Sequence, residues 1–227
     1  ASFRTNDPLR GGVELKAVEG SRLVDGDTFQ IATVDQTPAS NQTFEFDLGL
    51  VLDLPGGKSI ANGSQINVNG NIFTFSTSSG AGNNILYSLT DSPAQIATAV
   101  RGKLAAFFTV ATNSSRSNML NVTSAPVGGT YSVSGLPAAT IAALPGVAAG
   151  NVRIVVNQSM TATQIRDAVR SSLAQTFNAA GQGTNLNVWP VYGQTIKMFK
   201  YQVIDAGPMS VATRNGDFFG VQPSGGG

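Results

Sequence analysis

The first motif that could support chemistry resembles the end of a phosphate-binding loop. Residues 54–59 read L-P-G-G-K-S. A phosphate-binding loop also needs a glycine five residues before Gly57, where this chain has Leu52, and a helix after the loop. No helical pattern follows Ser59, so we interpret the segment as a turn.

A second glycine motif, Gly80-Ala81-Gly82, begins like a dinucleotide-binding fingerprint. The third glycine of that fingerprint is missing, because position 85 is Ile85. The fingerprint also requires a βαβ unit, and no such pattern surrounds the motif. The motif therefore predicts a loop.

Four aspartates could bind a metal ion if the fold brought them to one sheet edge: Asp25, Asp27, Asp47 and Asp53. Ca²⁺ takes several oxygen ligands, so these carboxylates make Ca²⁺ a candidate cofactor. Their spacing fits no EF-hand loop, and aspartate is common in turns. We favour turn-forming roles and expect neither a metal site nor another cofactor site.

Paired carboxylates can hydrolyse glycosides without histidine. The chain has three glutamates: Glu14, Glu19 and Glu45. Glu45 stands between Phe44 and Phe46 in an alternating segment, so its side chain should point to the opposite face of a strand. Since glutamate is mostly exposed in proteins, we expect a solvated sheet face here and no catalytic residues in the chain.

Five asparagines begin the N-x-S/T pattern of glycosylation acceptors: Asn41, Asn62, Asn113, Asn121 and Asn157. A chain rich in Asn, Ser and Thr contains several such patterns by chance. They are acceptors only if the source of the protein glycosylates such sites.

The composition excludes several kinds of site and partner. The chain has no Cys and no His, which excludes disulfides, His-based triads and the usual zinc sites. Its net charge of +1 gives no support for nucleic-acid binding. Charged residues are 12% of the chain, against about 25% in an average protein. No apolar run has the length of a membrane span.

Two helices are the best-defined elements that the sequence predicts. Residues 92–108 and 161–177 repeat one pattern, with Gln, Ile, Arg, Leu and Phe at the same places. Ser92 and Thr161 suit the N-cap, and a Gln three residues later gives each segment a capping box. In the first segment the apolar residues share one helical face: Ile96, Val100, Leu104 and Phe107.

The shared arginines of these segments, Arg101 and Arg170, occupy equivalent helical positions. A repeated contact to an anion or partner is one interpretation. We favour helix-flank residues whose stems cover apolar surface, which is the commoner role.

Alternating strands surround the helices. The hairpin pattern of residues 25–31 and 43–47 returns at 62–68 and 72–76, where Asn69-Gly70 predicts the turn. Further strands are expected at 119–123 and, as the longest one, at 195–204, and Asn215-Gly216 predicts a last hairpin. The aromatic residues that alternate within these strands should be core: Phe29, Phe44, Phe46, Phe73 and Phe75.

The hairpin D-G-D-T-F-Q-I … T-F-E-F-D, followed by the capped helix Q-I-A-T-A-V, resembles a module repeated in very large surface proteins of planctomycete-type bacteria. The match covers about residues 19–125, with a weaker echo in 126–190. The loop between the two strands is longer here than in that family and lacks its second D-G. The resemblance implies cell-surface location and architecture, not an activity.

These patterns predict an α+β, β-dominated fold. It would have antiparallel hairpins in sandwich-like sheets and two capped amphipathic helices in repeated strand–helix–strand units. We expect an N-terminal arm at 1–12, a first hairpin and helix module at 13–125, a second, degenerate module at 126–190, and a C-terminal hairpin with a Gly-rich tail at 191–227.

The functional expectation is a non-enzymatic, structural protein that assembles with copies of itself outside the cell or on its surface. A filament, sheath or surface layer would be built by strand or arm exchange, because unpaired sheet edges template strand addition. The alternative is an adhesin-like module that binds glycans or proteins through the loops at 35–42 and 77–84.

Overall fold

The structure of the protein is a computed structural model, which describes residues 13–33, 41–179, 189–191, 195–198 and 201–213. The chain divides into two compact units. Unit 2 comprises Asp47–Gly146 and Val155–Ser159. Unit 1 comprises Val147–Ile154 together with the described residues up to Phe46 and from Met160 onward. Unit 2 therefore interrupts unit 1 along the sequence.

The boundaries of the two units differ from those of the predicted modules. The predicted boundary at 125/126 falls inside unit 2, and the boundary at 190/191 falls inside unit 1. The predicted arm at 1–12, the hairpin around Asn215-Gly216 and the Gly-rich tail lie outside the described residues.

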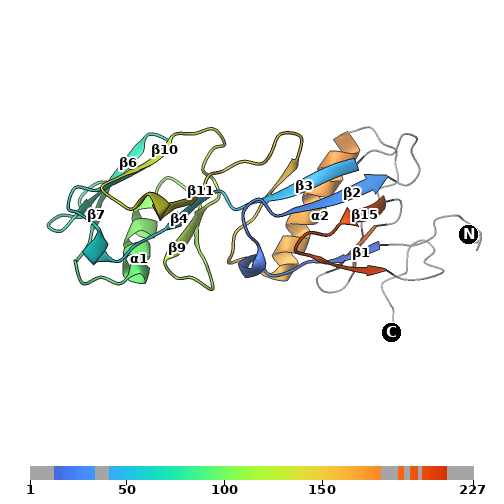
Figure 1. Cartoon of the computed structure of the whole chain (residues 1–227), viewed down its shortest axis with the longest axis horizontal. Coiled ribbons are helices and arrows are strands. Elements are labelled where there is room, and N and C mark those ends of the chain that lie inside the picture. Colours follow the sequence, from blue (N-terminus) through green and yellow to red (C-terminus); the bar gives the residue numbers. More distant parts are fainter. Residues whose placement is uncertain (1–12, 34–40, 180–188, 192–194, 199–200, 214–227) are drawn as a thin grey trace, which may run out of the picture. The chain divides into compact units, whose positions relative to one another are not determined.

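Unit 2 contains two four-stranded sheets and the helix α1 (Figure 1). The strand orders are β10-β5-β6-β7 and β11-β4-β9-β8. Their bounds are β4 Leu50–Asp53, β5 Gln65–Val68, β6 Asn71–Ser76, β7 Asn84–Leu86, β8 Val110–Thr112, β9 Met119–Val122, β10 Tyr131–Ser134 and β11 Ile141–Ala143. Neighbouring strands are antiparallel, except that β6 and β7 are parallel.

One hydrophobic cluster forms the core of unit 2. Strand alternation directs Phe73 and Phe75 of β6 and Ile66 of β5 into this cluster, where all three are fully buried. The other sheet contributes Leu52 and Leu120, which are paired across β4 and β9. Helix α1 (Pro93–Leu104) adds its apolar face, so both sheets and the helix share one core.

The hairpin turn predicted at Asn69-Gly70 is confirmed. It joins β5 to β6, and both residues have positive φ, 49° at Asn69 and 84° at Gly70. This is the conformation that Asn-Gly adopts in two-residue hairpins.

Helix α1 begins as predicted but ends earlier than residue 108. After Leu104, the amide of Phe107 donates to the carbonyl of Leu104, three residues back, at 2.9 Å. This tighter spacing ends the regular α-helix at this point. Its side chain is 51% exposed, and its ring lies edge-on to the buried Phe73, with the ring centroids 5.7 Å apart.

The capping box of α1 is confirmed, and it leads to a prediction for stability. The Oγ atom of Ser92 accepts from the amide of Gln95 at 3.3 Å, and Oε1 of Gln95 accepts from the amide of Ser92 at 2.8 Å. Ser92→Ala should lower the free energy of unfolding by about 1 kcal/mol, because it leaves a helix-end donor without its cap. Urea unfolding followed by circular dichroism measures this loss. Thr98→Ala in the exposed middle of α1 is the control and should change stability much less.

The described residues of unit 1 also form two four-stranded sheets and one helix, α2 (Ala162–Ala179). The strand orders are β12-β3-β2-β15 and β13-β14-β1-β16. Their bounds are β1 Val13–Lys16, β2 Thr28–Thr33, β3 Asn41–Asp47, β12 Val152–Val155, β13 Trp189–Val191, β14 Thr195–Met198, β15 Tyr201–Asp205 and β16 Ser210–Thr213. The β-dominated class with antiparallel sheets and two helices is confirmed.

The predicted aromatic core of unit 1 is confirmed. The rings of Phe29 and Phe44 are stacked, with their centroids 4.9 Å apart, and Phe46 lies 5.7 Å from Phe29. All three side chains are fully buried. Phe29 and Phe44 are paired across β2 and β3, and Phe46 lies two residues further along β3, so the alternation in both segments identified all three.

The longest predicted strand, residues 195–204, is wrong as a single element. It consists of β14 and β15, which belong to different sheets. β14 pairs with β1, and β15 pairs with β2. An apolar alternating run does not reveal that a chain changes its pairing partner part-way, because pairing is decided by residues far away in the sequence.

Candidate functional site

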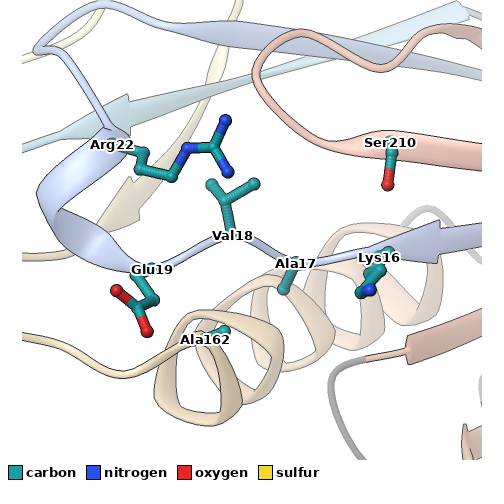
Figure 2. A pocket seen from close by; sticks show the side chains of 7 residues that line it. All are labelled: Lys16, Ala17, Val18, Glu19, Arg22, Ala162 and Ser210. Atoms are coloured by element: carbon teal, nitrogen blue, oxygen red, sulfur yellow. The ribbon is translucent and has the colours of Figure 1, made fainter.

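A surface pocket of about 430 Å³ in unit 1 gathers charged and apolar side chains from three parts of the chain. It is lined by Lys16, Ala17, Val18, Glu19, Arg22, Ala162 and Ser210 (Figure 2). Lys16 to Glu19 are consecutive at and after the end of β1, and Arg22 follows three positions later. Ala162 begins α2, and Ser210 begins β16. We call this hollow the unit 1 pocket.

Strand alternation and a short turn position the charges of the pocket. Leu15 and Ala17 are buried, so Lys16 between them points out of the core. Lys16 faces Ser210 across the antiparallel pair of β1 and β16. Glu19 then precedes the 3₁₀-helix η1 (Gly20–Arg22), which carries Arg22 at its end.

One hydrogen bond holds this turn against the start of the helix. The amide of Gly20 donates to the carbonyl of Met160 at 2.8 Å. Met160 lies two residues before Ala162, so the bond fixes η1 close to the first turn of α2. In Figure 2 the guanidinium of Arg22 extends above Val18, and the carboxylate of Glu19 lies on the side of Ala162. The lining of the pocket therefore includes two cations, one carboxylate, one hydroxyl and three apolar side chains.

Sequence reasoning did not select the unit 1 pocket. The alternation Leu15-Lys16-Ala17 could have placed Lys16 on an outer face, but nothing local indicates that Ser210 or Ala162 lies beside it. Those contacts depend on the pairing of β1 with β16 and on the bond from Gly20 to Met160.

The four aspartates proposed as Ca²⁺ ligands do not form one site. Asp25 and Asp27 belong to unit 1, whereas Asp47 and Asp53 belong to unit 2. Across the described residues, no group of three or more carboxylates could hold a metal ion. Asp27 accepts from the amide of Val24 at 2.8 Å, a turn contact of the predicted kind. Asp53 forms an ion pair with Arg116 at 2.7 Å, a partner that the sequence did not indicate.

Glu45 does not point to a solvated sheet face, so this prediction is wrong. Its side chain is only 9% exposed, because residues 148–151 cover it. Its Oε2 atom accepts from the amide of Ala148 at 2.9 Å and from the side-chain amide of Asn151 at 2.6 Å. Strand alternation correctly places Glu45 on the opposite face from the two phenylalanines. It cannot predict that a segment about a hundred residues later in the chain covers that face.

The phosphate-loop motif forms a turn, as predicted. Gly57–Ser59 is the 3₁₀-helix η2, which leads to β5 and not to an α-helix. The amide of Gly57 donates to the carbonyl of Asp91 at 2.9 Å, so it is not available to a phosphate.

The glycine loop at residues 77–84, one of the two proposed adhesin loops, is tied to α1. The ammonium group of Lys103 donates to the carbonyls of Gly80 and Gly82 at 2.6 and 2.8 Å. The other proposed loop, 35–42, lies mostly outside the described residues.

The asparagines of the glycosylation patterns differ in exposure. Asn113 is 5% exposed and Asn121 is fully buried, which excludes both as acceptors in the folded protein. Asn41 and Asn62 are exposed, and Asn157 is partly buried. Exposure of this kind depends on tertiary packing, so the short pattern could not reveal it.

Comparison with protein-family models, with curated proteins and with solved structures found no match to this chain. Within the described residues, neither helix is long and apolar enough to cross a membrane. The geometry of the units and of the unit 1 pocket therefore provides the basis for a functional proposal.

Proposed function

We propose that this chain is a structural, non-enzymatic protein that assembles with copies of itself at the cell surface or outside the cell. It would serve as a subunit or repeat of a filament, sheath or surface layer. Three features support the proposal: the matching topology of the two units, their matching hydrogen bonds, and the composition of the sheet edges.

The first feature is that both units place their elements in the same order. Unit 2 runs β4, β5, β6, β7, α1, β8, β9, β10, β11, and unit 1 runs β1, β2, β3, β12, α2, β13, β14, β15, β16. If each element of unit 1 is replaced by the element at the same place in unit 2, the sheet order β13-β14-β1-β16 becomes β8-β9-β4-β11. The same replacement changes the sheet order β12-β3-β2-β15 into β7-β6-β5-β10. These are the two sheets of unit 2.

The second feature is a hydrogen bond that recurs at the same place in both units. In unit 1 the amide of Gly20 in η1 donates to the carbonyl of Met160, and in unit 2 the amide of Gly57 in η2 donates to that of Asp91. Each acceptor stands directly before the N-cap of the unit's helix.

We therefore propose one module present twice, with the second copy inserted into the first. Its repeated strand–helix–strand part is β7-α1-β8 in unit 2 and β12-α2-β13 in unit 1. Its two sheets would pack as a sandwich, an arrangement that the shared core of both sheets in unit 2 supports. The resemblance to modules of planctomycete-type surface proteins fits this interpretation.

The third feature, which carries the assembly proposal, is that the sheet edges of unit 2 have no charged residue and no proline. Its edge strands are β7, β8, β10 and β11, with the sequences NIL, VAT, YSVS and IAA. Soluble proteins usually protect such edges with lysine, proline or bulges, and of these devices the unit 2 edges show only a register shift where β11 pairs with β4. Each edge here is short, so stable assembly would require the same pairing along many copies.

We assign the contact to the edge strand β7, because apolar side chains are exposed on and after it. Leu86 is 53% exposed and Leu89 is 60% exposed. Ile72 on the interior strand β6 is 47% exposed and stands on the same sheet face as Leu86, since Ile85 and Phe73 point to the core.

Leu86→Lys tests the assembly proposal, with Ile72→Lys as the matched control. The unsubstituted chain should form oligomers that grow with concentration in sedimentation analysis and electron microscopy. Leu86→Lys should abolish them, because a charge at the edge opposes strand pairing, and Ile72→Lys should preserve them. A chain that stays monomeric at every concentration would overturn the proposal. Assembly by both variants would exclude the β7 edge, and loss in both would indicate contact through the sheet face.

A further inference from the structure

The charged residues of the unit 1 pocket are not needed to build the turn that carries them. Aligning the two units on their shared hydrogen bond places Gly56 opposite Glu19 and Ser59 opposite Arg22. Unit 2 therefore forms the same 3₁₀ turn with neither charge at these positions. Because the turn forms without these charges, Glu19 and Arg22 can contribute to ligand recognition in unit 1.

The charges of the pocket favour an anion with one negative charge. Lys16, Glu19 and Arg22 are all exposed at the pocket wall, and together they carry a net charge of +1. The planar guanidinium of Arg22 suits a carboxylate, which it can bind through two parallel hydrogen bonds. The carboxylate of Glu19 repels a dianion such as phosphate more strongly than a monoanion.

The remaining lining suits a small polyhydroxylated molecule. The hydroxyl of Ser210 and the carboxylate of Glu19 can bond to ligand hydroxyls, and the partly exposed Val18 offers apolar surface to C–H groups. The volume of 430 Å³ lies within the range of about 300–1,000 Å³ that is typical of small-molecule sites.

We propose that the unit 1 pocket binds a uronic acid unit of an acidic polysaccharide. Lys16 and Arg22 hold the carboxylate of the sugar, Glu19 and Ser210 bond to its hydroxyls, and Val18 contacts its C–H face. The site does not depend on the assembly role proposed above. It gives glycan binding a location different from the two loops that the sequence suggested.

The test is an NMR titration of the full chain with glucuronate, with glucose and acetate as reference probes. Glucuronate should shift the amide signals of Val18 and Ala162, glucose should not, and acetate should bind more weakly. Glucuronate oligosaccharides should shift the same signals. Arg22→Gln and Lys16→Gln should each weaken glucuronate binding by about ten-fold or more, because each removes a charge-assisted contact.

Two further variants separate recognition from general charge effects. Glu19→Gln keeps an oxygen acceptor for the sugar hydroxyls and removes the charge that repels the sugar carboxylate, so it should strengthen glucuronate binding several-fold, which a purely structural residue would not do. Lys58→Gln in η2 of unit 2 changes the net charge as Lys16→Gln does and should leave binding unchanged. Absence of shifts at the pocket, equal binding of glucose, or equal losses in Lys58→Gln and Lys16→Gln would overturn the proposal. Equal binding of acetate would overturn its sugar specificity.

Discussion

Gly57→Ala is expected to destabilise unit 2 by about 3 kcal/mol or more, because it forces a methyl group into backbone atoms that have no room to move. A Cβ atom at Gly57 would overlap the carbonyl oxygen of Ser88 and lie 3.0 Å from its carbonyl carbon. The amide of Gly57 is also bonded to Asp91 at 2.9 Å, so the turn cannot withdraw without losing that bond. The close approach joins η2 to the segment between β7 and α1.

Hydrogen exchange of the β5 and β6 amides, which belong to unit 2, measures this loss directly. The single tryptophan, Trp189, belongs to unit 1, so its fluorescence reports the other unit. Gly102→Ala is the control, because a Cβ there meets no atom within 4 Å and the residue lies inside α1. It should stabilise the protein by about 1 kcal/mol, the helical preference of Ala over Gly. A Gly57→Ala variant with unchanged protection would contradict the close approach.

Asp47→Ala should lower the free energy of unfolding by about 3 kcal/mol, since it leaves the buried amide of Gly49 and the partly buried amide of Gly146 without an acceptor. Asp47 is fully buried. Its Oδ1 atom accepts from the amide of Gly49 at 2.6 Å, and its Oδ2 atom accepts from the amide of Gly146 at 2.9 Å. The second bond joins the end of β3 to a residue far along the chain, so the carboxylate connects the first and last residues of the segment Asp47–Gly146 of unit 2.

Asp205→Ala provides a matched control for the Asp47 variant. Asp205 makes the same local contact, with its Oδ1 atom accepting from the amide of Gly207 at 2.9 Å, but its side chain is exposed. Water can replace that acceptor, so the loss should stay within about 0.5 kcal/mol. Urea unfolding compares the two variants. Similar losses in both would show that burial and the bond to Gly146 add nothing to the role of Asp47.

Much of the local structure could be predicted because its causes lie within a few residues. The capping box of Ser92 and Gln95 and the turn at Asn69-Gly70 depend on side chains three residues apart or closer. Alternation identified Phe29 and Phe73 as core, because a strand exposes and buries its residues in turn.

Contacts between distant segments could not be predicted in this way. Glu45 was assigned to the solvated face because its own strand carries no sign of Ala148, whose amide it binds at 2.9 Å. The local sequence predicts one strand where the structure has β14 and β15, because their pairing with β1 and β2 depends on residues more than a hundred and fifty positions earlier. The unit 1 pocket was missed for the same reason.

The sequence by itself determined the β-rich class, the two capped helices, the principal turn and most of the apolar core. These follow from propensities and periodicities that act along a few residues of chain. Only the tertiary structure decided that unit 2 interrupts unit 1, that Glu45 and Asp47 hold remote backbone amides, and that Lys16, Glu19 and Arg22 surround a pocket with Ser210. Those features depend on which distant strands pair, and pairing is selected by the packing of whole sheets and their cores.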